Sequence, residues 1–177
     1  MSTVSKVEDG PSSRWAADER FDALVARRRT DLLKVAVLLS GSRHDADDAV
    51  QEAVLSVSGT WTRVLAGAAE PVVYAYLRRA VVRKCVDQHR RRLPLGEVPD
   101  RPVDDGGLLR FESDRRFFAM LAELPTQQRA VLVLRHYLDY DDVRIAAVLR
   151  IGRAAVRSNA MRGLQKLRQQ LGTEEEP

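Results

Sequence analysis

The spacing of the apolar residues is the feature that most limits what this chain folds into. From Phe21 onward, apolar residues recur every three or four positions, and the same spacing returns from Asp114 to Leu171. This spacing gathers apolar side chains on one face of an α-helix, whereas a half-buried strand needs strict alternation. No alternation of useful length is found, so the sequence predicts an all-α protein of helices packed on helices.

Capping signals divide the first part of the chain into three helices. Ser40 and Gly41 are expected to end the first helix, and Ser42 suits the N-cap of the second, with Asp45 three residues later as in a capping box. Pro71 suits the start of a third helix, because proline is favoured at the first helical position.

A change of composition indicates two small helical domains. Residues 93–113 hold three of the seven prolines together with glycines and acids, which is typical of a flexible linker. We expect one domain over 18–92 and another over 114–171. Residues 1–17 resemble a disordered lead-in, and residues 172–177 form a short acidic tail.

Several classes of function are disfavoured by what the chain contains. It has a single cysteine, Cys85, so an internal disulfide or a multi-cysteine zinc site is excluded. It has no Ser/His/Asp pattern, no HExxH and no glycine-rich phosphate loop, so we expect no enzyme, no cofactor and no metal. A lone buried cysteine is favoured over a reactive thiolate. No apolar run reaches the roughly 18 residues of a membrane span, so a cytoplasmic protein without membrane insertion is expected.

Residues 141–162 have the pattern of a helix-turn-helix. Asp141 can cap a short first helix, whose inward residues include the small Ala146 that a crossing helix needs. Ile151 would fill the turn, and Val156 would face the core from the second helix.

The second helix of this motif is cationic, with no acid before Glu174. Basic side chains supply affinity for DNA phosphates, while a few side chains read base edges in the major groove. The candidate DNA contacts on this helix are Arg153, Arg157, Ser158, Arg162 and Lys166.

The chain resembles the extracytoplasmic-function sigma factors of the sigma-70 family in blocks that follow the same order. Their domain that reads the minus-thirty-five element is similar to LPTQQRAVLVLRHYLDYDDVRIAAVLRIGRAAVRSNAMRGLQKLR. Their other conserved domain is similar to FDALVARRRTDLLKVAVLLSGSRHDADDAVQEAVLSV, and its helix for the minus-ten element is similar to YAYLRRAVVRKCVDQHRRR. The resemblance covers about residues 20–171 and implies a sigma factor that directs promoter recognition, DNA melting and transcription initiation.

The resemblance also implies partners and site residues. Core RNA polymerase would bind through its beta-prime clamp helices and beta flap, and the acidic segment HDADDAVQEAV would dock on the clamp helices. The candidates for that docking are Asp45, Asp48, Gln51 and Glu52; for Asp45, complementing the helix dipole is an equal alternative. Promoter DNA is the second partner, and an anti-sigma factor is a possible third.

The minus-ten strand would be held by the basic third helix, with a tyrosine stacking on a base and a flipped base held near the loop 66–70. We expect at least one of the two tyrosines to be core. The candidates are Tyr74, Tyr76, Arg78, Arg79, Arg83, Lys84 and Arg90.

Several residues depart from the family pattern. The chain has Arg83 where Asn is common, Tyr76 where Trp is common and Ala155 where Thr is frequent. Arg150 replaces a turn glycine, which is costly if that position has a positive φ, unless Gly152 moves the turn.

Two other functions fit part of the sequence. A stand-alone or partner-dependent helix-turn-helix regulator would explain the C-terminal motif, although no receiver domain is visible in the N-terminal half. An RNA-binding or structural helical protein would explain the charge but not the paired blocks.

Overall fold

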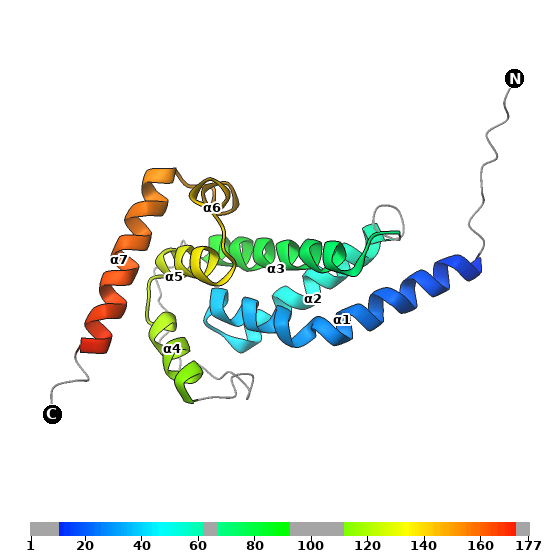
Figure 1. Ribbon diagram of the computed structural model, residues 1–177, viewed down its shortest axis with the longest axis horizontal. Coiled ribbons are helices and arrows are strands. Elements are labelled where there is room, and N and C mark those ends of the chain that lie inside the picture. The colour runs from blue at the N-terminus through cyan, green and yellow to red at the C-terminus, as the bar shows by residue number, and fades with distance from the viewer. Residues whose placement is uncertain (1–10, 62–66, 93–111, 173–177) are drawn as a thin grey trace, which may run out of the picture.

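The computed structural model describes residues 11–61, 67–92 and 112–172, and every regular element in these ranges is a helix. Figure 1 shows their arrangement. The elements are α1 (Pro11–Ser40), α2 (Arg43–Thr60), α3 (Glu70–Arg92), α4 (Glu112–Ala122), α5 (Thr126–Leu132), the π-helical turn η3 (Val133–Tyr137), α6 (Asp142–Leu149) and α7 (Arg153–Gly172). The predicted all-α class is confirmed.

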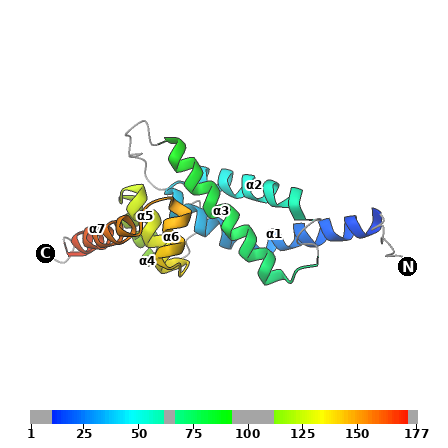
Figure 2. The ribbon, with the colours of Figure 1, turned by 90° about the horizontal axis from the view of Figure 1, so that it is seen from above.

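Helices α1, α2 and α3 pack on one another and form the N-terminal bundle. Each contributes a fully buried apolar stripe, represented by Leu32, Val50 and Leu77, none of which exposes any surface. These stripes follow the helical spacing of the sequence, so burial of apolar surface determines which face of each helix points inward. In Figure 2, α3 crosses the front of this bundle.

Helix α1 begins earlier than the apolar spacing predicts. It starts at Pro11, so residues 11–17 belong to the helix and not to a disordered lead-in. Proline suits the first helical position, and Ala16 and Ala17 have high helix propensity. The other end follows the prediction: α1 ends at Ser40, and Gly41 has a φ of 72°.

Helices α4 to α7 form the C-terminal bundle, in which α5 and α7 are in closest association. Gly163 of α7 is buried, and a Cβ there would lie 2.9 Å from Cδ1 of Leu132. The absence of a side chain at Gly163 therefore lets α7 approach the end of α5. Leu134 of η3 and Ile145 of α6 are fully buried in this bundle.

The two bundles touch each other. Helix α1 packs against α4 and α5, and α6 lies against α3. In Figure 1, α5 and α6 lie beside the C-terminal part of α3, away from the start of α1. Residues 93–111 of the expected linker, residue 66 of the expected base-holding loop and the tail residues 173–177 lie outside the described residues.

Candidate nucleic-acid interface

Helices α6 and α7 form the helix-turn-helix that the sequence predicts. Asp141 caps α6, because its side chain accepts a hydrogen bond of 2.7 Å from the backbone N–H of Arg144. In the turn, the N–H of Ile151 donates to the carbonyl of Ala146 at 3.1 Å. Val156 is fully buried and fixes α7 on the bundle. One edge of α7 is thereby presented to solvent.

Arg150 occupies the turn with left-handed backbone angles, φ 55° and ψ 47°. Gly152 does not have a positive φ, so the alternative in which Gly152 moves the turn is wrong. A non-glycine residue in this region costs roughly 1–2 kcal/mol. The chain therefore carries a cationic side chain at a position where glycine would be less strained.

The N-terminal end of α7 carries three of the predicted DNA contacts. Arg153 and Arg157 are exposed, and Ser158 is half-buried. Further along, Arg162 is exposed and its Nε donates to the carbonyl of Ser158 at 3.4 Å. The Nζ of Lys166 donates to the carbonyl of Glu123, the residue after α4, at 3.0 Å. Lys166 is thus engaged within the bundle.

On α3 the two candidate tyrosines have different surroundings. Tyr74 is partly buried against the core, with the guanidinium groups of Arg28 and Arg78 at 5.1 and 5.8 Å from its ring centroid. Burial, followed by the nearby Asp31 carboxylate, raises the pKa of its hydroxyl. Tyr76 is 42% exposed. Tyr76 is therefore the more accessible ring for stacking on a base.

The basic residues of α3 are divided in the same way. Lys84 pairs with Glu52 of α2, with 3.1 Å between Nζ and Oε2. Arg79, Arg83 and Arg90 are exposed, whereas Arg78 is half-buried beside Tyr74.

Arg79 and Arg83 line a cleft of about 480 Å³ between α3 and α6. Tyr140, Arg144 and Arg150 line its opposite wall. The guanidinium of Arg144 lies 3.6 Å from the ring centroid of Tyr140, close enough for a cation–π contact. The place of Tyr140 and Arg144 in this cleft could not be predicted from the sequence, because nothing local to α6 indicates that it approaches α3.

The predicted polymerase-binding residues all lie on α2, but their exposure to solvent differs. Asp45 is buried, with 9% of its surface exposed, and it follows the capped start of the helix. Asp48, Gln51 and Glu52 are exposed on the other face. Leu55, three residues beyond Glu52 and 65% exposed, extends this face with an apolar side chain. The helical spacing from Asp48 to Leu55 places both residues on one face of α2, and this spacing could have identified Leu55 from the sequence.

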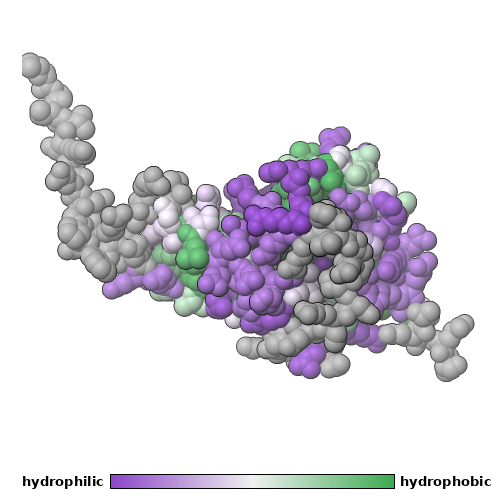
Figure 3. All heavy atoms as spheres, turned by 180° about the vertical axis from the view of Figure 1, so that it is seen from behind, coloured by the Kyte–Doolittle hydropathy of each residue, from purple (hydrophilic) through white to green (hydrophobic). Residues whose placement is uncertain are grey.

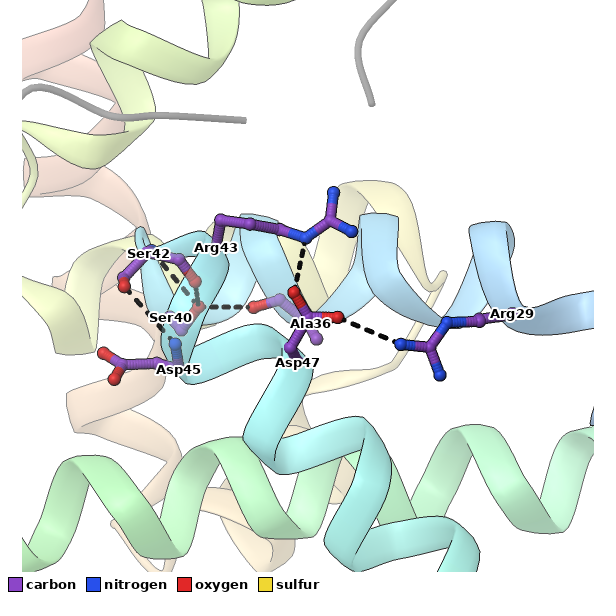
Figure 4. A network of polar contacts seen from close by, with 7 residues as sticks. All are labelled: Arg29, Ala36, Ser40, Ser42, Arg43, Asp45 and Asp47. Atoms are coloured by element: carbon purple, nitrogen blue, oxygen red, sulfur yellow. Dashed lines mark hydrogen bonds and ion pairs between the residues drawn. The ribbon is translucent and has the colours of Figure 1, made fainter. Parts of the chain in front are cut away.

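Figure 4 shows how the start of α2 is fixed. The hydroxyl of Ser42 accepts a hydrogen bond from the N–H of Asp45 at 3.4 Å, which confirms Ser42 as the N-cap. Asp47 accepts from Nε of Arg43 at 2.7 Å and from Nη2 of Arg29 at 3.2 Å. These contacts join α1 to α2. Oδ2 of the next residue, Asp48, lies 3.7 Å from Nε2 of the exposed His44.

Cys85 is buried in the bundle with 5% of its surface exposed. Burial raises the pKa of its thiol to about 12, so the thiol is protonated at neutral pH.

Within the described ranges no group of His, Cys, Asp and Glu side chains is arranged to hold a metal ion. In the same ranges, no helix has the length and apolar character of a membrane span. Figure 3 shows a largely hydrophilic face with small hydrophobic patches.

Family models match both bundles. The model of sigma-70 region 2 matches residues 24–93, and the model of sigma-70 region 4 matches residues 114–167.

Curated relatives cover most of the chain. The RNA polymerase sigma-E factor of Streptomyces avermitilis is 31% identical over 156 residues, spanning 85% of this chain and 84% of the relative. The ECF RNA polymerase sigma factor SigM of Mycobacterium tuberculosis is 32% identical over 160 residues, spanning 86% and 77%.

Solved structures share the fold. CnrH in complex with the cytosolic domain of CnrY matches with a TM-score of 0.56 and 22% identity, over 93% of this chain and 95% of that one. The sigma factor RpoE in complex with the anti-sigma factor NepR from Bartonella quintana matches with a TM-score of 0.56 and 18% identity, over 87% and 98%.

Together the helix-turn-helix, the second basic helix and these matches define a helical, DNA-binding protein of the transcription machinery. The chain belongs to the sigma-70 family of RNA polymerase sigma factors, in its extracytoplasmic-function group. It is an alternative sigma factor, and its function lies in transcription initiation.

Proposed function

We propose that this chain binds core RNA polymerase and brings it to promoters through two DNA contacts, one made by each bundle. The observation that carries the proposal is the pairing of a basic helix-turn-helix in one bundle with an exposed acidic face in the other. A stand-alone DNA-binding protein has no need for the second surface.

The C-terminal bundle would bind the minus-thirty-five element as duplex DNA. Arg153 and Arg157 lie at the exposed start of α7, where a recognition helix enters the major groove. Their guanidinium groups can contact phosphates or form bidentate hydrogen bonds to guanine. Ser158 and Arg162 continue this edge, and we assign Lys166 a supporting role because it is held by the carbonyl of Glu123.

The N-terminal bundle would hold the unwound minus-ten strand. Tyr76 would stack on a base, while Arg79, Arg83 and Arg90 would contact phosphates. Tyr74, Arg78 and Lys84 would support this surface, because each already contacts other side chains in the bundle.

The exposed face of α2 would dock on the clamp helices of the largest polymerase subunit. Asp48, Gln51 and Glu52 present polar and acidic groups there, and Leu55 adds apolar area. Asp45 would act inside the bundle instead, as a first-turn acid that complements the dipole of α2. The beta flap would contact the C-terminal bundle.

We further propose that the chain is not itself an enzyme and acts in the cytoplasm, where its polymerase partner is located. An anti-sigma factor is proposed as a regulator, by analogy with the NepR complex of the RpoE sigma factor. We propose that residues 18–92 and 114–171 act as two domains joined by residues 93–113. Two modest DNA contacts on one chain reinforce each other, because the second contact is intramolecular.

The direct test is to incubate the purified chain with core RNA polymerase, recover the complex and run transcription on genomic fragments. We expect a stable complex and new start sites that share two sequence elements. A folded chain that binds promoter fragments but never associates with core polymerase would contradict the proposal and support a stand-alone regulator.

A further inference from the structure

The cleft between α3 and α6 gathers four arginines from both bundles. Arg79 and Arg83 are four positions apart on α3, so they share one face of that helix. Arg144 of α6 and Arg150 of the following turn line the opposite wall. The cleft has a volume of about 480 Å³, and α6 lies beside the C-terminal part of α3 (Figure 1). Both bundles therefore contribute positive charge to one site.

The four guanidinium groups have little negative charge to offset them. Among the described residues none of the four forms an ion pair, and Asp87 is the acid in the lining of the cleft. Like charges that share a small cleft repel one another, and an anion with several negative charges relieves that repulsion. The surplus of positive charge therefore favours a multiply charged anion over a single carboxylate.

Arg144 is restrained in a way that leaves it able to bind such an anion. Its guanidinium lies 3.6 Å from the ring centroid of Tyr140, and Tyr140 is anchored in the bundle with 4% of its surface exposed. A cation–π contact orients the guanidinium without engaging its N–H donors. These donors remain for phosphate oxygens, which a guanidinium binds two at a time.

Arg150 lines the cleft from a strained position. Its backbone is left-handed, with a φ of 55°, where glycine would be less strained. Its side chain is exposed and forms no hydrogen bond or ion pair with the described residues, so contacts of the side chain do not compensate for the strain. Strained residues of this kind are found at ligand sites, where binding makes use of the side chain they place.

The lining of the cleft also has an apolar part. Val82 and Val86 of α3 are buried and Val148 of α6 is half-buried, and all three line the cleft. Small-molecule sites combine such apolar side chains with a few polar groups and have volumes of roughly 300–1,000 Å³. The cleft therefore has the size and the lining of a site for a small molecule larger than one phosphate ion.

We infer that this cleft binds a small anion with two or more phosphate groups, either a nucleoside polyphosphate or a short inorganic polyphosphate. The guanidinium groups of both walls hold the phosphate groups, and the valines contact the nucleoside where the ligand has one. The consequence for DNA rests on the proposed function. Arg79 and Arg83 are also assigned to the minus-ten strand, so the bound anion and the strand compete for them.

Isothermal titration calorimetry of the full chain tests the site, with inorganic tripolyphosphate, GTP and inorganic phosphate as probes in about 0.15 M salt. We expect one site that binds tripolyphosphate at least about tenfold more tightly than inorganic phosphate, since each added phosphate group makes further charge-assisted hydrogen bonds. Tighter binding of GTP than of tripolyphosphate identifies a nucleotide as the source of the phosphate chain. Equal binding of the two identifies an inorganic polyphosphate.

Variants of each wall locate the bound anion. The double variant Arg144→Gln, Arg150→Gln removes the charges of the α6 wall and leaves every residue of the two proposed DNA contacts in place. It should weaken tripolyphosphate binding at least about tenfold. The double variant Arg79→Gln, Arg83→Gln should weaken it similarly, because the phosphate groups contact both walls. Circular dichroism and thermal melting check that each variant folds.

The charge-matched control is Arg20→Gln with Arg168→Gln, which removes two exposed charges outside the cleft and should leave the affinity unchanged. Three results would overturn the inference. They are no binding of tripolyphosphate by the parent chain, unchanged affinity in a folded variant of either wall, and an equal loss in the control, which would show that net charge and not the cleft attracts the anion.

Fluorescence anisotropy of a labelled single-stranded oligonucleotide tests the competition. Tripolyphosphate at about ten times its own Kd should weaken oligonucleotide binding about tenfold, compared with sodium chloride at the same ionic strength. Tripolyphosphate that binds without competing would confirm the site and contradict the minus-ten roles of Arg79 and Arg83. A chain that binds tripolyphosphate at the cleft but fails to bind core polymerase would confirm the site and contradict the proposed function alone.

Discussion

Helices α3 and α7 are both rich in arginine, but their basic side chains have different surroundings. On α7, Arg153 and Arg157 extend into solvent from the exposed edge of the helix-turn-helix. On α3, Lys84 is paired with Glu52 and Arg78 lies over Tyr74. The more exposed Arg79 and Arg83 face a cleft whose other wall is α6.

The difference shows that the number of basic side chains on a helix does not determine how accessible they are to DNA. Basic residues supply affinity for phosphates wherever they lie, but only those with open surroundings bind without a rearrangement. Arg153 and Arg157 of α7 extend into solvent, whereas Arg79 and Arg83 of α3, although exposed, share their cleft with Arg144 and Arg150.

The largest expected effect comes from truncating a buried side chain of α3. Leu77→Ala deletes a fully buried side chain and should lower the free energy of unfolding by about 3 kcal/mol, since such truncations lose apolar burial and leave a cavity. Urea unfolding followed by circular dichroism measures the change. The control Leu55→Ala, on the exposed face of α2, should stay within about 0.5 kcal/mol; equal losses would contradict the assigned core.

The accessibility of α7 predicts a selective loss of promoter use. Arg157→Ala should lower transcription from the cognate promoter about tenfold, because a lost base contact typically costs roughly 1–3 kcal/mol. Run-off transcription measures this, and core polymerase binding should be unchanged.

Arg168→Ala on the same helix is the matched control, because it removes a similar exposed charge further from the turn. We expect it to retain most activity. A parallel loss of transcription and core binding in Arg157→Ala would indicate misfolding.

The acidic face of α2 distinguishes the N-terminal bundle from the C-terminal one. Reversing charge with Asp48→Lys and Glu52→Lys together should weaken core polymerase binding about fivefold, since like charges then oppose docking. Equilibrium binding of labelled protein measures the affinity. Asp22→Lys, at an exposed position on α1, is the control; unchanged affinity in the double variant would remove Asp48 and Glu52 from the interface.

The smallest expected effect concerns the turn before α7. Arg150→Gly should raise the free energy of unfolding by about 0.5 kcal/mol: relief of left-handed strain, roughly 1–2 kcal/mol, is largely offset by the greater freedom of glycine when unfolded. Thermal unfolding measures the sign. Arg150→Ala keeps the Cβ and the strain, so a similar gain there would point to charge repulsion in the cleft as the cause.

Much of the fold was predictable because its signals are local. The Ser42 and Asp141 caps, the end of α1 and the inward face of α2 each depend on residues within a few positions of one another. The helix-turn-helix followed from the same kind of spacing. These features are encoded where they occur, so a single sequence is enough to predict them.

What escaped prediction depends on distant pairs. Arg129 donates to the carbonyl of Leu39, 90 positions away, and a backbone acceptor leaves no residue type to recognise. The hydrogen bond from Lys166 to the carbonyl of Glu123, just after α4, could not be predicted for the same reason. The π-helical turn η3 begins within a run of consecutive buried apolar residues, Ala130 to Leu134, in which the helical spacing is lost. That run was the one available signal for the irregularity.

The burial of Cys85 determines how readily an oxidant can react with its thiol. The thiolate is the form that oxidants attack, and a pKa of about 12 leaves almost none of it at cellular pH. Cys85 is also the only cysteine in the chain, so no second thiol can capture a sulfenic acid. Peroxide would therefore oxidise the thiol of Cys85 only slowly, so we expect this residue to pass no oxidative signal to transcription by itself.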